Sequence, residues 1–267
     1  MIRVANAPVS YGAFELTVGV LPNVPGPHEV LDAIAAAGYE GTELGPIGYL
    51  GCGDELRSRL DSRGLSLAGA FVELRFGDGD LSALEATLGV LEGFDAKPVL
   101  CDKGPRDGDV DLAGVERAVE LTRGRGFEPT FHHHMGTRVQ TPAEIGRLLE
   151  GTSVGLLLDT GHVTAGGGEP VRGLREWRER IDHLHLKDVR LDVLREAADW
   201  DEAWRQGVFC ELGSGDVDLE GFFAELDGYS GWLVVEQDWV PGPADEFAGQ
   251  AQAQARNRRW LTEHAGL

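Results

Sequence analysis

Short apolar runs alternate with amphipathic helical stretches along the chain, and this order constrains the fold more than any other feature. Eight runs have the length and composition of buried parallel strands, and a helical stretch or loop follows each of them. The expected strands are 2–9, 41–44, 66–74, 98–101, 129–134, 154–159, 181–186 and 232–236. Eight such units in a chain of 267 residues predict an α/β fold, a single (β/α)8 TIM barrel over residues 1–267.

A doubly wound sheet would also alternate strands with helices, but no G-x-G-x-x-G motif opens a helix after an early strand. The clearest helices are 28–38, which ends at Gly38, and 141–151, which begins with a threonine cap, a proline and a glutamate. No linker divides the chain, so we expect one domain. Segment 189–215 is an insertion after the seventh strand, and its Trp200 and Trp204 could cover a site as a lid.

Composition excludes several classes of function. The net charge is −21, with 24 basic and 45 acidic residues, and no basic stripe is present to bind nucleic acid. No apolar run approaches the 18 residues or so that a membrane span requires. The three cysteines are far apart and odd in number, which is typical of a reducing compartment. We therefore expect a cytoplasmic protein without nucleic-acid or membrane partners.

In a TIM barrel the active site lies at the C-terminal ends of the strands, and polar residues gather there in this sequence. Asp159, His185 and Glu236 end three consecutive strands and should converge on one axis. Each could be structural when taken alone: Asp159 as a turn cap, His185 as a core histidine, Glu236 as the partner of an arginine. Together they predict a site for a divalent metal, because mixed oxygen and nitrogen ligands suit Mn²⁺, Mg²⁺, Co²⁺ or Zn²⁺.

The strand "HLHLKD" places His183, His185 and Lys187 on one face, because side chains alternate along a strand. If the intervening leucines pack under the helices, His183 fills the core, His185 binds metal and Lys187 reaches the mouth. A metal beside Lys187 is expected to lower its pKa.

The same alternation divides the run "FHHHMGT". His132 and His134 should face the lumen, while His133 should turn towards the helices as a structural residue. The run is therefore not expected to form a site with three histidine ligands.

Several strings resemble a known group: "GYEGTELGPIGYLG", "FHHHMGTRVQTPAEI", "GLLLDTGH", "HLHLKDV", "GSGDVD" and "GWLVVEQD". They resemble the xylose isomerase-like TIM-barrel superfamily, the sugar phosphate isomerase/epimerase group, and within it most closely the inosose (2-keto-myo-inositol) dehydratases. The similarity covers nearly the whole chain, from the first strand to the eighth.

This resemblance implies a bound divalent metal, with Mn²⁺ or Co²⁺ favoured and Mg²⁺ or Zn²⁺ the other candidates. Asp159, His185 and Glu236 match three of the group's ligands. The group commonly takes its first ligand from a glutamate near strand five, and this chain has none there. We expect Gln140 as the fourth ligand, with His132 as the alternative.

The resemblance also implies chemistry through an enediolate, in which a metal polarises a carbonyl and a base removes the neighbouring proton. Loss of water from 2-keto-myo-inositol, by a hydro-lyase, is the favoured outcome. Isomerisation or epimerisation of a keto-sugar and C-glycoside cleavage stay open as alternatives, as does a non-enzymatic sugar-binding barrel with a decayed site. An endonuclease IV-like activity is disfavoured by the acidic charge.

Site residues follow from these expectations. The substrate should be a small polyol or sugar, and the protein could form a homo-oligomer. Lys187, His134 and Glu43 are expected to act in catalysis. The residues expected to bind substrate are Asn6, Glu73, Lys103, His162 and Asp238.

Overall fold

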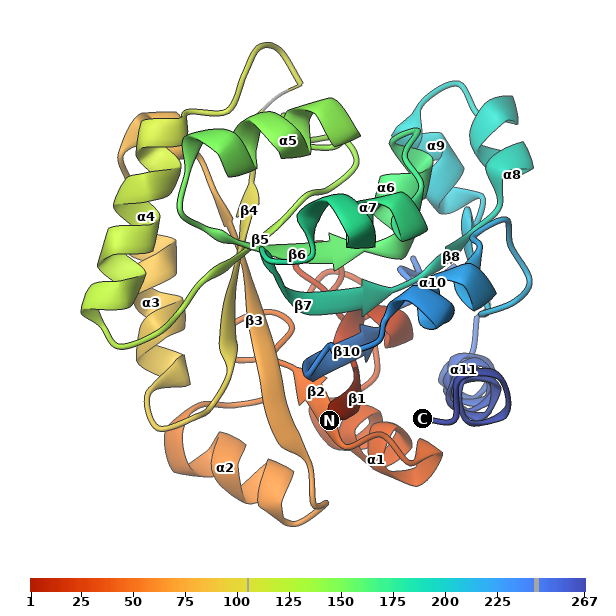
Figure 1. Cartoon of the computed structure of the whole chain (residues 1–267). Coiled ribbons are helices and arrows are strands. Elements are labelled where there is room, and N and C mark those ends of the chain that lie inside the picture. The colour runs from red at the N-terminus through yellow and green to blue at the C-terminus, as the bar shows by residue number, and fades with distance from the viewer. Residues whose placement is uncertain (105, 243–244) are drawn as a thin grey trace.

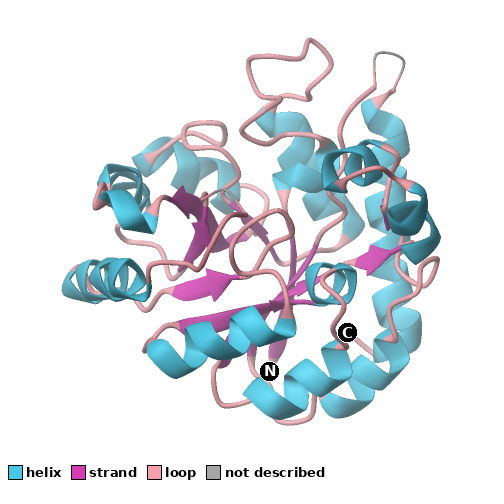
Figure 2. Ribbon diagram, turned by 90° about the horizontal axis from the view of Figure 1, so that it is seen from above, coloured by secondary structure: helices cyan, strands magenta, loops and turns pink. Residues whose placement is uncertain are grey.

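The computed structural model describes residues 1–104, 106–242 and 245–267. Eight parallel strands close into a barrel in the order β1-β10-β7-β6-β5-β4-β3-β2, and helices surround it (Figures 1 and 2). The predicted (β/α)8 barrel is therefore confirmed. The barrel strands are β1 (Ile2–Asn6), β2 (Gly41–Glu43), β3 (Ser66–Leu74), β4 (Lys97–Asp102), β5 (Thr130–His132), β6 (Gly155–Asp159), β7 (Ile181–Leu186) and β10 (Gly231–Val235).

Helices cover the outside of the barrel and bury the side chains that point outward from the strands. They are α1 (Pro27–Ala37), α2 (Gly53–Asp61), α3 (Ser82–Leu91), α4 (Leu112–Gly124), α5 (Pro142–Gly151), α6 (Thr160–Ala165), α7 (Pro170–Trp177), α10 (Leu219–Glu225) and α11 (Phe247–Ala265), with 3₁₀ turns η1 (Pro8–Tyr11) and η2 (Phe76–Asp78). A second, small cluster fills part of the lumen with Ala5, Ala7, Ala68, Trp232 and Val234. No helix within the described residues is both long and apolar enough to cross a membrane.

The segment after β7 departs from the simple strand–helix repeat. It contains β8 (Asp188–Val189), α8 (Leu191–Glu196), α9 (Trp200–Arg205) and β9 (Phe209–Cys210), and β8 pairs antiparallel with β9. In Figure 1, α8 and α9 lie on the side towards which the arrows of β6 and β7 point. The insertion expected at 189–215 is thus a small folded unit at the C-terminal end of the barrel.

Two expected strands are shorter than the sequence pattern suggested. Strand β1 ends at Asn6 because Pro8 begins the turn η1, and β5 ends at His132. The helix expected at 141–151 is α5, and Thr141 caps it through a hydrogen bond from the Glu144 backbone N–H, while the Glu144 carboxylate accepts from the Thr141 N–H at 2.8 Å.

Candidate metal centre and pocket

Four ionisable side chains meet at the C-terminal end of the barrel: His132, Asp159, His185 and Glu236. The first three come from the last or next-to-last residues of β5, β6 and β7, and Glu236 directly follows β10. One nitrogen or oxygen atom of each lies within 4.8 Å of the others, and none of the four residues is more than 5% exposed. Buried charges at this density need a compensating cation or donor.

The two oxygens of Asp159 have different surroundings. Its Oδ1 accepts the His162 backbone N–H at 2.8 Å and so caps α6. Its Oδ2 has no hydrogen-bond partner, although the residue is fully buried. Asp159 can therefore cap the helix with Oδ1 and still offer Oδ2 to a metal ion.

Hydrogen bonds determine which ring nitrogen of His132 and of His185 faces Asp159 Oδ2. His132 donates from Nδ1 to the His133 carbonyl at 2.5 Å, and His185 donates from Nε2 to Glu43 Oε1 at 3.1 Å. The other nitrogens, His132 Nε2 and His185 Nδ1, each lie 3.7 Å from Asp159 Oδ2. Their lone pairs are thereby directed at the centre of the cluster, as ligation requires.

This donor set fits a divalent cation. His185 Nδ1 lies 2.9 Å from Glu236 Oε2 yet has no hydrogen-bond partner. Asp159 Oδ2 has no hydrogen-bond partner either, and its nearest cation is Lys187, whose Nζ lies 3.3 Å away. Burial lowers the pKa of His185, but the carboxylates of Glu236 and Glu43 outweigh it and raise that pKa well above its usual value. The surroundings thus favour a positive charge at this point, and two imidazoles with two carboxylates would hold one metal ion.

Glu43 stands behind His185 and takes part in a chain of hydrogen bonds. Its Oε1 accepts from Nε2 of both His183, at 3.0 Å, and His185, at 3.1 Å. A register shift between Thr42 and Glu43 redirects the side chain, and Gly69 leaves room for it, since a Cβ there would lie 2.9 Å from Oε1. Burial raises the pKa of Glu43, but His185 and the two hydrogen bonds outweigh it and hold that pKa well below its usual value.

The hydrogen bonds of Glu43 suit a positioning role beside the catalytic role expected. A carboxylate bonded to the far nitrogen of a ligating histidine fixes its tautomer and orientation. Glu43 is placed to hold His185 in this way, and His183, the expected core residue, also donates a hydrogen bond to it.

The Lys187 side chain ends between three acidic groups at the edge of the cluster. Its Nζ lies 2.9 Å from Glu236 Oε2 and from Asp238, and 3.3 Å from Asp159 Oδ2. Burial lowers its pKa, but these three carboxylates outweigh it and raise the pKa well above its usual value. The lowering expected beside a bound metal stays a prediction. Gly161 lets the side chain pass, because a Cβ there would lie 2.6 Å from the Lys187 Cβ.

His134 presents one free nitrogen to the pocket. Its Nδ1 donates to the Met135 carbonyl at 2.8 Å, which leaves a lone pair on Nε2. Burial and the nearby Lys187 charge lower the pKa of His134, so the neutral ring is favoured. His133, by contrast, is fully buried and accepts the Asp159 backbone N–H at Nε2, 3.2 Å away, as expected for a structural residue.

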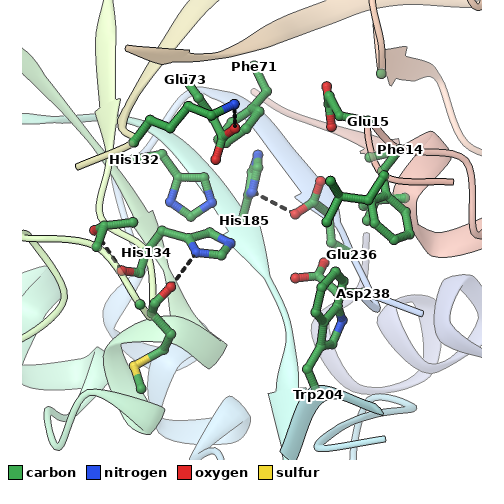
Figure 3. Close-up of a pocket in the computed structure, with 18 of the residues that line it drawn as sticks. Phe14, Glu15, Phe71, Glu73, His132, His134, His185, Trp204, Glu236 and Asp238 are labelled. Atoms are coloured by element: carbon green, nitrogen blue, oxygen red, sulfur yellow. Dashed lines mark hydrogen bonds and ion pairs between the residues drawn. The ribbon is translucent and has the colours of Figure 1, made fainter. Parts of the chain in front are cut away.

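A pocket of about 470 Å³ opens above the cluster. Figure 3 shows His132, His134, His185, Glu236 and Asp238 around it. The expected site residues that line it are Glu43, Glu73, Lys103, His132, His134, His185, Lys187, Glu236 and Asp238. Glu73 and Lys103 form an ion pair of 3.0 Å at its rim.

Asp159 belongs to the cluster but is not part of the pocket lining, and three further expected site residues lie elsewhere. Asn6 points outward from β1, and its side-chain nitrogen donates to Gln254 of α11. His162 is fully buried behind Lys187, whose Nζ lies 3.2 Å from its Nε2. Gln140 accepts the Gly136 N–H, which turns its oxygen towards its own loop. The structure thus favours His132 over Gln140 as the fourth ligand, and neither Asn6 nor His162 is part of the pocket lining.

Sequence reasoning missed other residues of the pocket. They are mainly on loops, where no strand period places them: Phe14, Glu15, Leu16, Phe71, Asp102, Met135, Thr137 and Asp201. Two of them had a signal: Asp102 ends β4, and Phe71 shares a face of β3 with Glu73. Trp200 and Trp204 of the insertion also line the pocket.

Comparison with known proteins now adds to this geometry. Residues 109–264 match the Xylose isomerase-like TIM barrel family. The chain belongs to that family. An inosose dehydratase of Geobacillus kaustophilus is 31% identical over 286 residues, which cover 92% of this chain and 90% of that protein. One from Geobacillus thermodenitrificans is 38% identical over 183 residues, or 65% of this chain and 59% of that protein.

Solved structures of this family share the fold at low sequence identity. The crystal structure of the IOLI protein with a binding zinc atom superposes with a TM-score of 0.74 and 13% identity, covering 99% of this chain and all of that one. At this level of identity the likeness establishes the barrel and not the chemistry. The chemistry has to be argued from the site itself.

Proposed function

We propose that this protein is a metal-dependent hydro-lyase that removes water from 2-keto-myo-inositol or a close keto-polyol through an enediolate. The observation that carries the proposal is the convergence of His132 Nε2, Asp159 Oδ2, His185 Nδ1 and Glu236 in one cluster. This cluster is the floor of the pocket: His132, His185 and Glu236 line the pocket, and Asp159 lies buried beneath them. The inosose dehydratases that match most of the chain favour the same substrate.

The metal would be held by His132, Asp159, His185 and Glu236, and it would supply the Lewis acidity that makes the hydrogen next to the substrate carbonyl acidic. Two imidazole ligands favour Mn²⁺, Co²⁺ or Zn²⁺ over Mg²⁺, which prefers oxygen ligands. Loading of the purified protein with each ion, followed by metal analysis, tests this order.

The elimination needs a base and an acid, and His134 and Lys187 would supply them. His134 has a free Nε2 lone pair and would take the proton from the carbon next to the carbonyl. The Lys187 ammonium group contacts three carboxylates beside the cluster, and it would give a proton to the hydroxyl that leaves from the next carbon. One proton and one hydroxide leave the substrate as water, so no oxidant or reductant is needed. Glu73, Lys103 and Asp238 would bind substrate hydroxyls.

Segment 189–215, the insertion after β7, would act as a lid. Its Trp200 and Trp204 line the pocket, so segment 189–215 would cover bound substrate as part of one barrel domain. The unpaired Cys52, Cys101 and Cys210 are in keeping with a reducing, cytoplasmic setting.

The test uses metal-loaded protein and 2-keto-myo-inositol in D₂O, followed by NMR and mass spectrometry. We expect loss of one water and deuterium at the carbon next to the carbonyl. Deuterium incorporation without water loss would instead favour the isomerase or epimerase alternative. Absence of both, with keto-sugars included in the screen, would contradict the enediolate proposal and favour a binding-only barrel.

A further inference from the structure

A second cavity opens at the opposite end of the barrel from the metal centre. It measures about 640 Å³, within the range of roughly 300–1,000 Å³ that is usual for small-molecule sites. Lys97, Ile181 and Gly231 line it, and they are the first residues of β4, β7 and β10. We call it the N-terminal cavity. Because this end of a TIM barrel usually contributes to stability, a binding role has to be argued from its polar groups.

A β-bulge brings the Asp182 side chain into the lining of this cavity. The register of β6 and β7 shifts there, so that Asp182 is the extra residue between Ile181 and His183. Gly155 leaves room for the carboxylate, since a Cβ there would lie 2.5 Å from Asp182 Oδ2. The same oxygen pairs with Lys97 Nζ at 2.6 Å, which links β7 to β4 across the end of the barrel.

Two buried acceptors of the lining have no hydrogen-bond partner among the residues that the structure describes. They are Oδ1 of Asp182 and Nδ1 of His183, a residue that is itself fully buried. His183 donates from Nε2 to Glu43, so its Nδ1 carries a lone pair. A buried acceptor without a donor is unfavourable, and both atoms therefore require a ligand or a water molecule that supplies O–H or N–H groups.

The charges of the lining favour a neutral ligand. Its ionic groups already have partners of opposite charge: Asp182 with Lys97, Glu128 with Arg123, and Arg3 with Glu40. Asp95, the remaining acid of the lining, is exposed to solvent. An anion or a cation would therefore enter a cavity whose charges are already matched.

A hydroxyl-rich molecule suits the two acceptors. Hydroxyl groups can donate to Asp182 Oδ1 and His183 Nδ1 without adding charge, and their lone pairs can accept the N–H groups of Lys97 that Asp182 leaves over. An amine would place a second cation close to the Lys97 ammonium group. The chemistry of the N-terminal cavity is thus that of a polyol site.

His183 also links this cavity to the metal centre. Its Nε2 and the Nε2 of His185 donate to the same oxygen, Glu43 Oε1, at 3.0 and 3.1 Å. A donor bound at His183 Nδ1 polarises the ring and strengthens its hydrogen bond to Glu43. The bond from His185 to that oxygen then weakens, and with it the support of a metal ligand. Occupancy of the cavity should therefore lower the affinity for metal.

We propose that the N-terminal cavity is a second site, for a neutral polyol, and that its occupancy is transmitted to His185 through His183 and Glu43. The site itself does not depend on the proposed function, whereas the transmission requires His185 to bind metal. By linkage, the metal should weaken polyol binding by the same factor.

Hydrogen–deuterium exchange with myo-inositol as the probe locates the site. The probe lacks a carbonyl and forms no enediolate, although it can also enter the catalytic pocket. We expect it to protect backbone amides in 94–97, 126–128 and 230–232, whether or not 13–16 at the catalytic pocket is protected as well. Protection of these segments by L-serine and not by myo-inositol would overturn the neutral class. Absence of protection by either would mean that water alone fills the cavity, and would overturn the site.

Two variants test the location. Ser230→Trp fills the cavity from an exposed position, and Asp182→Ala removes one of the two acceptors. Both should abolish the protection of 94–97 and leave the effect at 13–16 unchanged. Asp227→Trp is the matched control, because Asp227 is exposed, lies three residues before Ser230 and is not part of the lining. Protection that survives both cavity variants contradicts the location.

Competition with a chelator measures the transmission. Saturating myo-inositol should lower the metal affinity of the wild type about fivefold or more relative to its effect on Ser230→Trp. This comparison isolates the N-terminal cavity, because myo-inositol in the catalytic pocket acts on both proteins alike. Equal effects on the two would overturn the transmission. Absence of deuterium exchange on 2-keto-myo-inositol would remove the proposed function and leave the protection of 94–97 in place.

Discussion

The floor and the mouth of the pocket are built in opposite ways. On the floor, His132, Asp159 and His185 stand at strand ends and are at most 2% exposed. At the mouth, Phe14, Leu16 and Trp204 come from a loop and an inserted helix. The barrel therefore fixes the groups on the floor, while the mouth is built by segments that can change without altering the barrel.

The hydrogen bonds follow the same division. Each histidine on the floor has its second nitrogen bonded, to the His133 carbonyl or to Glu43, and one oxygen of Asp159 is bonded as well. At the mouth, the Glu73–Lys103 pair is 35% and 55% exposed, and such pairs contribute little to stability. Substitutions on the floor should thus abolish chemistry, and substitutions at the mouth should change selectivity or stability.

The largest effect is expected from Asp159→Asn. The change removes a charged ligand from the centre of the cluster, so metal content should fall far below one ion per chain. The rate of α-deuterium exchange should fall roughly a thousandfold or more, since several kcal/mol of Lewis-acid stabilisation are lost. Metal analysis measures the metal content, and NMR measures the rate of deuterium exchange. Asp109→Asn, an 82% exposed carboxylate, is the control. A metal-free variant with full activity would contradict the proposed role of the floor.

Lys187→Met should separate proton transfer from metal binding. Lys187 contacts three carboxylates but is not one of the four grouped ligands. Loss of a positioned acid costs about a hundredfold or more in rate. We expect that loss in water elimination with metal content near one ion per chain. A normal elimination rate would remove Lys187 from the mechanism.

Glu43→Gln should have a smaller effect, because it acts through His185. The amide cannot accept from two histidines with the strength of a carboxylate, so His185 would lose its fixed orientation. Metal affinity should fall about tenfold to a hundredfold, measured by competition with a chelator. A variant with unchanged metal affinity would show that Glu43 does not position the ligand.

The sequence predicted the floor well because strand ends obey two simple rules. Parallel strands bring their C-terminal ends together, and alternation along a strand decides which side chains face the lumen. These rules placed Asp159, His185 and Glu236 in one cluster and separated His133 from its neighbours. They also predicted the barrel, since each apolar run needed a helix to cover it.

The mouth could not be predicted in the same way. Loop residues such as Phe14 and Leu16 have no period, and their neighbours are distant in sequence. Ala5 of β1 faces the lumen, so its neighbour Asn6 faces outward and bonds to Gln254 instead of lining the pocket. The side-chain oxygen of Gln140 accepts a hydrogen bond from its own loop and therefore turns away from the cluster. The family resemblance indicates which residue types bind the metal. It does not show which side chain would face the metal where a strand end differs from the family's sequence.

The smallest effect is expected at the loop that carries His134 into the pocket. Glu144 of α5 accepts from the Gln140 and Thr141 N–H groups and pairs with Arg106, whose guanidinium also donates to the Thr137 carbonyl. Glu144→Ala should lower the free energy of unfolding by about 1 kcal/mol, the usual value of a lost cap. Metal content should not change, because the floor is untouched. Glu150→Ala, an exposed position on the same helix, is the control.

The effect should also depend on pH. Burial raises the pKa of Glu144, but the hydrogen bonds from Thr141, Gln140 and Arg106 outweigh it and lower the pKa from 4.5 to about 2. A lowered folded-state pKa stabilises the protein above the unfolded value, and this contribution is lost as the pH falls from about 4.5 to about 2. The difference between wild type and Glu144→Ala in denaturant unfolding should therefore be full at about pH 7 and clearly smaller at about pH 3. A difference that is constant over this range would mean that the carboxylate charge does not hold the loop.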